Sequence, residues 1–127
     1  MESSTKKPKR VALIAHDGKK QRMLEWAERN KAVLQQQFLS GTATTGKLIQ
    51  EATGLPIKLY RSGPYGGDLQ IASLIAEGEI DMLIFFWDPL EAQSHDPDIK
   101  ALLRIATLYD IPTANTESTA DCLIKLM

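Results

Sequence analysis

Short apolar runs alternate with longer amphipathic stretches along this chain, and this alternation constrains the fold more than any other feature. We predict strands at 11–15, 38–40, 57–60, 82–87 and 113–116. Stretches with helical spacing follow them, at 19–37, from the glycine turn at 41–46 to Gly54, at 67–78, after His95 and from about Ser118. Because right-handed crossovers are strongly favoured, such alternation predicts a mainly parallel five-stranded sheet with helices on both faces. The predicted fold class is therefore α/β, a single-domain three-layer sandwich with the very apolar 82–87 run near its centre.

Length and composition narrow the function classes. With 127 residues the chain is long enough for one core, which we place at 11–127 after a flexible basic N-terminal tail at 1–10. The net charge of −1 argues against nucleic acid as the main partner, and no apolar run is long enough to cross a membrane. Cys122 has no second cysteine for an intrachain disulfide and is expected in the core. With no secretory signal evident, this favours a cytoplasmic location.

Polar and glycine-rich residues gather where the predicted strands end. They lie at 16–17, 42–46, 62–68 and 88–98, and at Asn115. Ligands of open parallel sheets bind beyond the carboxyl ends of the strands, so we expect all five ends to contribute to one site. Trp87, at the end of its strand, is a candidate for the wall of that site.

The glycine-rich segment at 62–68 ends in a carboxylate, Asp68, at the predicted start of a helix. Two interpretations remain open for this side chain. Asp is favoured in the first turn of a helix for capping and charge alone. In a turn that also binds anions, the same carboxylate can instead serve as a base.

A second turn, Gly-Thr-Ala-Thr-Thr-Gly at 41–46, places three hydroxyls and several N–H groups at another helix start. Free N–H groups and the helix dipole favour an anion there, although a threonine cap with a glycine turn is an equally good explanation. Ser62 and Gly63 offer further donors, and Lys20 adds a positive charge. Together they favour a small phosphorylated ligand. The turn lacks the spacing of a P-loop, and no GxGxxG follows the first strand, so a dinucleotide is disfavoured.

The two histidines, His16 and His95, are candidates for proton transfer, although a surface or capping role is the commoner one for an isolated histidine. We predict no metal, because the two lie on different loops without a recurrent ligand spacing. Ser62 has no evident base to activate it as a nucleophile. Proton transfer by carboxylate and imidazole on a phosphorylated substrate is the chemistry that remains.

Several motifs, taken together and in order, closely resemble the methylglyoxal synthase family. They are Ala-His-Asp at 15–17 with Lys20, the turn at 41–46, Ser-Gly-Pro-Tyr-Gly-Gly-Asp at 62–68, Phe-Phe-Trp-Asp-Pro-Leu at 85–90 and His-Asp-Pro-Asp at 95–98. The resemblance runs from about Val11 to the end. It implies a methylglyoxal synthase-like, Rossmann-like fold and a carbon–oxygen lyase that converts dihydroxyacetone phosphate to methylglyoxal and inorganic phosphate, a bypass of glycolysis. It also implies a cytoplasmic homohexamer without cofactors, with phosphate as product and candidate inhibitor.

The resemblance also implies roles for individual residues. Asp68 would be the catalytic base, with His95 and Asp98 assisting proton transfer. The substrate-binding residues would be His16, Lys20, Thr42, Ala43, Thr44, Thr45, Ser62, Gly63 and His95. Ala43 stands where the family commonly has glycine, so a positive φ at this position would be strained. The chain also ends at Met127 without the basic tail of many members, which puts regulation through such a tail in doubt.

Two competing functions are kept beside the lyase. The same fold forms the allosteric domain of carbamoyl phosphate synthetase large subunits, which binds effectors without chemistry. An isomerase that stopped at the enediol would release glyceraldehyde phosphate instead. The joint presence of Asp68, His95 and Asp98 favours an enzyme, because an effector-binding domain needs no poised carboxylate.

Overall fold

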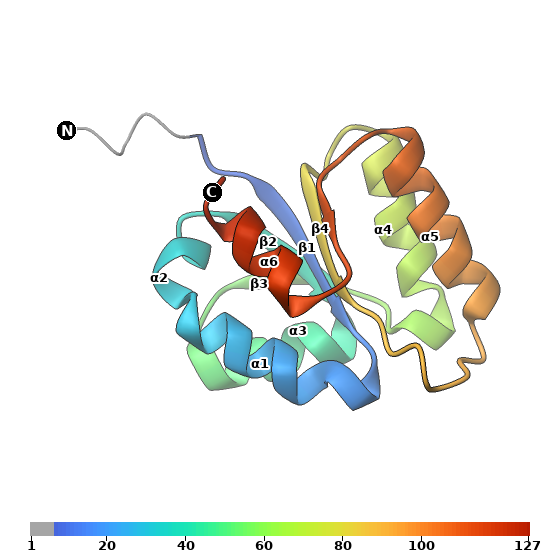
Figure 1. The fold of residues 1–127 in the computed structure, drawn as a ribbon, viewed down its shortest axis with the longest axis horizontal. Coiled ribbons are helices and arrows are strands. Elements are labelled where there is room, and N and C mark those ends of the chain that lie inside the picture. The colour runs from blue at the N-terminus through green and yellow to red at the C-terminus, as the bar shows by residue number, and fades with distance from the viewer. Residues whose placement is uncertain (1–6) are drawn as a thin grey trace.

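The computed structural model describes residues 7–127, which form a five-stranded sheet between two layers of helices (Figure 1). The first six residues of the expected tail lie outside the described part. The strands are β1 (Arg10–Ala15), β2 (Phe38–Thr42), β3 (Ile57–Tyr60), β4 (Met82–Phe86) and β5 (Thr113–Ala114). Their order is β3-β2-β1-β4-β5, and every pairing is parallel. The predicted three-layer α/β class is confirmed.

The helices cover the two faces of this sheet unequally. They are η2 (Asp17–Lys19), α1 (Lys20–Arg29), α2 (Lys31–Leu34), α3 (Ala43–Thr53), η3 (Gly63–Tyr65), α4 (Gly67–Ala76), α5 (Asp96–Leu108) and α6 (Glu117–Ile124). Helices α1, α3 and α6 lie on one face, and α4 and α5 lie side by side on the other (Figure 1). The single helix predicted over 19–37 is interrupted at Asn30, whose backbone and side-chain amides both bond to the Trp26 carbonyl oxygen.

The middle strand is β1, and it divides the core into two clusters. Val11, Leu13 and Ala15 face the α1 side, whereas Ala12 and Ile14 face α4 and α5. A strand buried on both faces must be apolar throughout, which explains the unbroken run at 11–15. Strand β4, expected near the centre, lies one place away, between β1 and β5.

Several boundaries differ from the prediction. Strand β1 starts at Arg10, whose N–H and guanidinium both bond to the Asp81 carboxylate. Strand β2 continues through Gly41, because this residue pairs with both neighbouring strands instead of turning. The prediction that Cys122 is in the core is wrong: its side chain is exposed, since α6 buries only Ala120.

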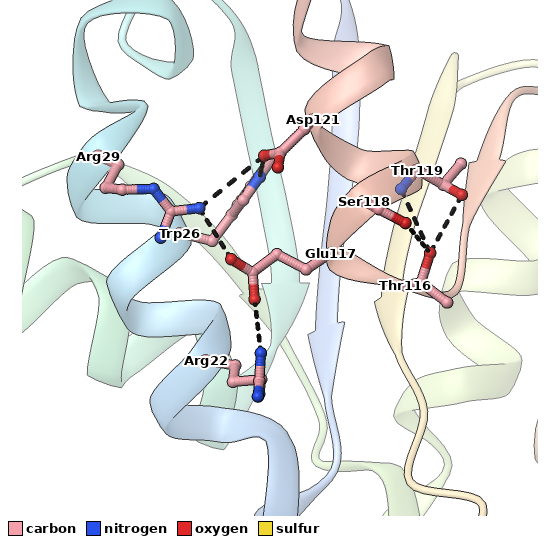
Figure 2. Close-up of polar contacts among 8 residues, drawn as sticks. All are labelled: Arg22, Trp26, Arg29, Thr116, Glu117, Ser118, Thr119 and Asp121. Carbon is pink, nitrogen blue, oxygen red and sulfur yellow. Dashed lines mark hydrogen bonds and ion pairs between the residues drawn. The ribbon is translucent and has the colours of Figure 1, made fainter.

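The last helix, α6, is joined to α1 by a cluster of charged side chains (Figure 2). Thr116 caps its start by accepting a hydrogen bond from the N–H of Thr119. From the first turn of α6, Glu117 reaches Arg22 and Arg29 on α1. Across residues 7–127 no helix has both the length and the apolar character needed to cross a membrane.

Candidate active site

A cavity of about 240 Å³ opens at the carboxyl ends of β1, β2 and β3. It is lined by eight of the predicted site residues, His16, Lys20, Thr42, Thr44, Ser62, Gly63, Asp68 and His95. These residues come from four different chain segments, which the parallel sheet brings to one edge. Sequence reasoning found this part of the site because all of these residues except Lys20, the first residue of α1, belong to polar or glycine-rich segments after strands.

Other predicted residues do not line this cavity. Thr45 is buried, and its hydroxyl bonds to both the N–H and the carbonyl oxygen of Ala15, each at 3.2 Å. Asp98 is half-buried on α5, and Ala43 is the first residue of α3. No positive φ occurs at a non-glycine residue within 7–127 except at Asp110, so the expected strain at Ala43 is absent.

The five strand ends do not share one site, which corrects the prediction. Trp87 and Asn115 line a separate cavity of about 450 Å³, together with Arg22 and Pro89. The reason is that β5 ends beside α6 on the far side of β4, while the active-site cavity lies over β1, β2 and β3. The wall that we assigned to Trp87 is therefore formed by other residues.

One corner of the active-site cavity is suited to a phosphate. It contains the start of α3, where the first N–H groups of a helix have no partner within the helix. The hydroxyls of Thr44 and Ser62 lie 3.0 Å apart there. Two hydroxyls that share one hydrogen bond are free to turn toward an anion, so this corner offers several donors without rearrangement.

Lys20 adds the positive charge, and two acceptors fix its position. Its Nζ bonds to the carbonyl oxygen of Ala15 at 2.7 Å and to the carboxylate of Asp17 at 2.9 Å. Asp17 is fully exposed, and its hydrogen bond from Lys20 lowers the pKa of its carboxyl. The ammonium is thus held at the mouth of the cavity, in reach of an entering anion.

Asp68 is the most unusual group in the cavity. Only 1% of its surface is exposed, and neither carboxylate oxygen has a hydrogen-bond partner among residues 7–127. Burial raises the pKa of this carboxyl; the charge of His95 opposes the rise, and that of Asp98 adds to it. The His95 Nε2 lies 3.6 Å from Oδ2. A buried, unpartnered carboxylate with a raised pKa is suited to take a proton from carbon.

Gly63 lets the backbone approach Asp68 and His95, and Gly67 lets the backbone pass close to itself. A Cβ atom on Gly63 would lie 2.5 Å from Nε2 of His95 and 3.3 Å from Oδ1 of Asp68. A Cβ atom on Gly67 would overlap the carbonyl oxygen of Arg61. The glycine-rich sequence therefore brings the backbone of η3 into contact with the Asp68–His95 pair.

His16 completes the cavity from the end of β1. It is buried, its Nδ1 accepts a hydrogen bond from the N–H of Asp88 at 3.0 Å, and its ring meets Phe85 and His95 edge to face. Within residues 7–127 no group of three His, Cys, Asp or Glu side chains is arranged to hold a metal ion.

Sequence reasoning missed some polar groups of the cavity. Asp17, Tyr65 and Gln93 also line it. Asp17 and Tyr65 lie inside motifs that carry the family resemblance, so these motifs could have identified them as site residues. Gln93 lies in an irregular loop, and the N–H of Asp88 is a backbone group; neither has a sequence signature.

Comparisons with known proteins agree with this arrangement. The MGS-like domain family matches residues 22–115. The methylglyoxal synthase of Clostridium acetobutylicum is 59% identical over 117 residues, covering 92% of this chain and 81% of that protein. That of Clostridium botulinum strain Eklund 17B is 56% identical over 116 residues, covering 91% of this chain and 98% of that protein. The chain belongs to the methylglyoxal synthase family.

A solved structure extends the agreement to the backbone. The crystal structure of methylglyoxal synthase from Elizabethkingia anophelis NUHP1 matches with a TM-score of 0.88 at 44% identity, covering 94% of this chain and 78% of that chain. The predicted membership of the methylglyoxal synthase family, with its lyase class, is confirmed. The roles of individual residues remain predictions.

Proposed function

We propose that this chain converts dihydroxyacetone phosphate to methylglyoxal and inorganic phosphate. The observation that best supports this reaction is Asp68, a buried carboxylate that has no hydrogen-bond partner among residues 7–127 and shares one small cavity with an anion-binding corner. A substrate with its acidic carbon at one end and its phosphate at the other would place these two ends at Asp68 and at the corner. A cavity of about 240 Å³ suits a three-carbon phosphate ester.

The first step is the removal of a proton from the hydroxymethyl carbon. The proton passes to Asp68, the electron pair of the C–H bond forms a carbon–carbon double bond, and the carbonyl oxygen becomes the enediolate oxygen. The raised pKa of Asp68 matches this task, because a carboxylate with greater proton affinity is a stronger base. The negative charge of Asp98 supports the same property from the first turn of α5. His95, beside the base, is placed to move protons between the substrate oxygens.

The second step is the loss of phosphate. The proton of the hydroxymethyl oxygen moves to the former carbonyl oxygen, so that the negative charge lies on the oxygen of the deprotonated carbon. That oxygen then forms a carbonyl group, the carbon–carbon double bond shifts toward the carbon that bears the phosphate, and the bond between this carbon and the phosphate oxygen breaks with its electron pair leaving on phosphate. The enol that remains takes a proton on its methylene carbon and loses its hydroxyl proton to become methylglyoxal.

Elimination requires the bond between carbon and the phosphate oxygen to stand perpendicular to the enediolate plane. We propose that Lys20, Thr44, Ser62 and the N–H groups at the start of α3 hold the phosphate in that position.

The test measures both products. Purified protein is incubated with dihydroxyacetone phosphate, and methylglyoxal and free phosphate are quantified beside Asp68→Asn. The proposal expects equal amounts of the two products, lost in the variant. Glyceraldehyde phosphate in place of methylglyoxal would make the chain an isomerase. Binding of the ester without any product would make it an effector-binding domain.

We also propose, from family resemblance, that the chain acts in the cytoplasm as a homohexamer and that phosphate inhibits it by occupying the Thr44 corner. Analytical ultracentrifugation tests the assembly, and a single species of monomer mass would reject it. Product formation at increasing phosphate concentration tests the inhibition, which should be competitive with dihydroxyacetone phosphate.

A further inference from the structure

The hydrogen bond between His16 and the loop after β4 fixes which ring nitrogen carries a proton. Nδ1 of His16 lies 3.0 Å from the backbone nitrogen of Asp88. A backbone N–H can only donate, so Nδ1 must present its lone pair. The proton of the neutral ring therefore resides on Nε2.

The other side of the ring is buried and unused. Only 5% of His16 is exposed, and its Nε2 has no hydrogen-bond partner among residues 7–127. The residue lines the same cavity as Asp68. Its position is also set by the backbone, because the N–H of His16 bonds to the carbonyl oxygen of Phe86 on β4. A rigid, desolvated donor is thus left for a ligand.

The surroundings of His16 keep it uncharged. Protonation of the ring would place a hydrogen on Nδ1 against the N–H of Asp88 and break that contact. Burial lowers the pKa of His16, as do the nearby His95 and Lys20, while Asp88 and Asp17 act weakly in the opposite direction. The neutral form of the ring is therefore favoured relative to that of a free histidine.

We propose that His16 is a catalytic electrophile, a neutral imidazole held as the Nε2–H tautomer by the backbone of Asp88, which donates a hydrogen bond to the enediolate oxygen. This proposal rests on the proposed function and adds a role to a residue for which the resemblance implied only substrate binding. Under it, Asp68 removes the proton while His16 stabilises the charge that forms on oxygen.

A neutral donor suits this reaction better than an imidazolium. An imidazolium at this position would carry a charge that burial disfavours, and its Nδ1 hydrogen would meet the N–H of Asp88. A fixed, neutral N–H stabilises the developing charge on oxygen by a hydrogen bond. Triosephosphate isomerase uses a neutral histidine on its own enediolate in this way.

Two substitutions separate the two nitrogens of the ring. In His16→Asn the amide oxygen occupies the place of Nδ1 and keeps the contact with Asp88, but the side chain ends short of the cavity. In His16→Gln the amide nitrogen reaches the place of Nε2 and keeps a donor for the substrate. We expect His16→Asn to lose about 10²- to 10³-fold in kcat, the effect of removing one such donor. His16→Gln should retain clearly more activity.

Three measurements make the result decisive. The unchanged protein, assayed in parallel, must form methylglyoxal, so failure of the proposed function is seen separately. Thermal unfolding and inorganic phosphate binding by both variants show that the fold and the anion corner are intact. Imidazole ¹⁵N spectra of the unchanged protein at pH 7, with His16 assigned from His16→Asn, should show a bare Nδ1 and a protonated Nε2. A proton on Nδ1, or His16→Asn at least as active as His16→Gln, would overturn the proposal.

Discussion

Two polar regions of this molecule differ in whether their polar groups have hydrogen-bond or ion-pair partners. In the cluster between α1 and α6, each charged group has a partner (Figure 2). Glu117 bonds to Arg29 at 2.8 Å and to Arg22 at 3.3 Å, while Asp121 accepts from Trp26 Nε1 at 3.0 Å. All four charged side chains are at least a quarter exposed. Water competes with pairs of this kind, so each contributes about 0–1 kcal/mol.

Four polar atoms of the active-site cavity are buried and have no hydrogen-bond partner among residues 7–127. They are both oxygens of Asp68, Nε2 of His16 and Nδ1 of His95. A buried polar group without a hydrogen bond costs about 1–3 kcal/mol of stability. The comparison teaches that the exposed charges between α1 and α6 are paired for small gains, whereas these four buried atoms of the cavity lack hydrogen bonds at the expense of stability.

The largest effect expected from this contrast is that of Asp68→Asn. Activity should fall by about 10³-fold or more, because the base is lost. At pH 7 the free energy of unfolding should rise by about 1 kcal/mol, because an unpaired buried charge is removed. A folded-state pKa above the unfolded value means that ionisation of Asp68 destabilises the protein as pH rises through the folded pKa. The higher free energy of unfolding of Asp68→Asn should therefore vanish below about pH 4.

Urea unfolding of both proteins at pH 7 and at pH 4 measures this difference, with product formation as the activity readout. A variant that is inactive and also less stable at pH 7 would show that Asp68 supports the fold. It would contradict the contrast between the exposed cluster and the active-site cavity.

The next effect concerns Gly63→Ala. A methyl group there must displace His95 and Asp68, so kcat should fall by about 10²-fold. Gly78→Ala is the matched control, since Gly78 lies at the end of α4 with a φ of 74° and no atom near its missing Cβ. It should cost about 1–3 kcal/mol of stability and leave kcat unchanged. Steady-state kinetics and thermal unfolding of both variants distinguish packing at the site from general backbone strain.

A smaller effect separates two neighbouring threonines on α3. Thr44→Val should raise KM about tenfold, because it removes a hydroxyl from the phosphate corner. Thr45→Val should instead lower the free energy of unfolding by about 1–3 kcal/mol, because both backbone groups of Ala15 lose a bond. Steady-state kinetics and urea unfolding of both variants measure KM and the free energy of unfolding. If the two variants changed KM and stability in the same way, this prediction would be contradicted.

The smallest effect is expected for Glu117→Gln in the exposed cluster. The hydrogen bonds of Arg29 and Arg22 lower the pKa of Glu117, so its contribution is present above the unfolded pKa and is lost as pH falls through the folded one. We expect a loss of about 0.5 kcal/mol at pH 7, absent in 1 M salt, with unchanged kcat. Glu51→Gln, on the exposed side of α3, is the control. A loss above about 2 kcal/mol would show that the cluster is more than a surface network.

The sequence predicted most of the fold because the alternation of strands and helices follows from which residues must be buried. Strand β3 and the start of α4 lie where the pattern placed them. The errors concern orientation. Cys122 was expected in the core because its neighbours are apolar, but the face that a two-turn helix buries depends on what packs against it. Gly41 was expected in a turn because glycine favours turns, yet it pairs with two strands.

For the site, motifs placed eight of the predicted residues at one cavity but did not tell which way each one points. Thr45 turns from the cavity toward Ala15, and Asn115 belongs to the neighbouring cavity. The tautomer of His16 depends on a backbone N–H 72 positions away, which no side-chain pattern encodes. Such details follow from tertiary packing, so only a three-dimensional structure supplies them.

The central position of β1 has a consequence for synthesis of the protein. Val11 at its start pairs with Met82, so the strand that carries His16 remains half-paired until β4 has left the ribosome. A nascent chain that ends before β4 already contains Lys20, Thr44, Ser62 and Asp68, but it cannot place His16, whose N–H needs Phe86. Pairing over so long a separation is slow. Catalytic competence should therefore arise only late in translation, and a truncated chain should release no reactive dicarbonyl into the cell.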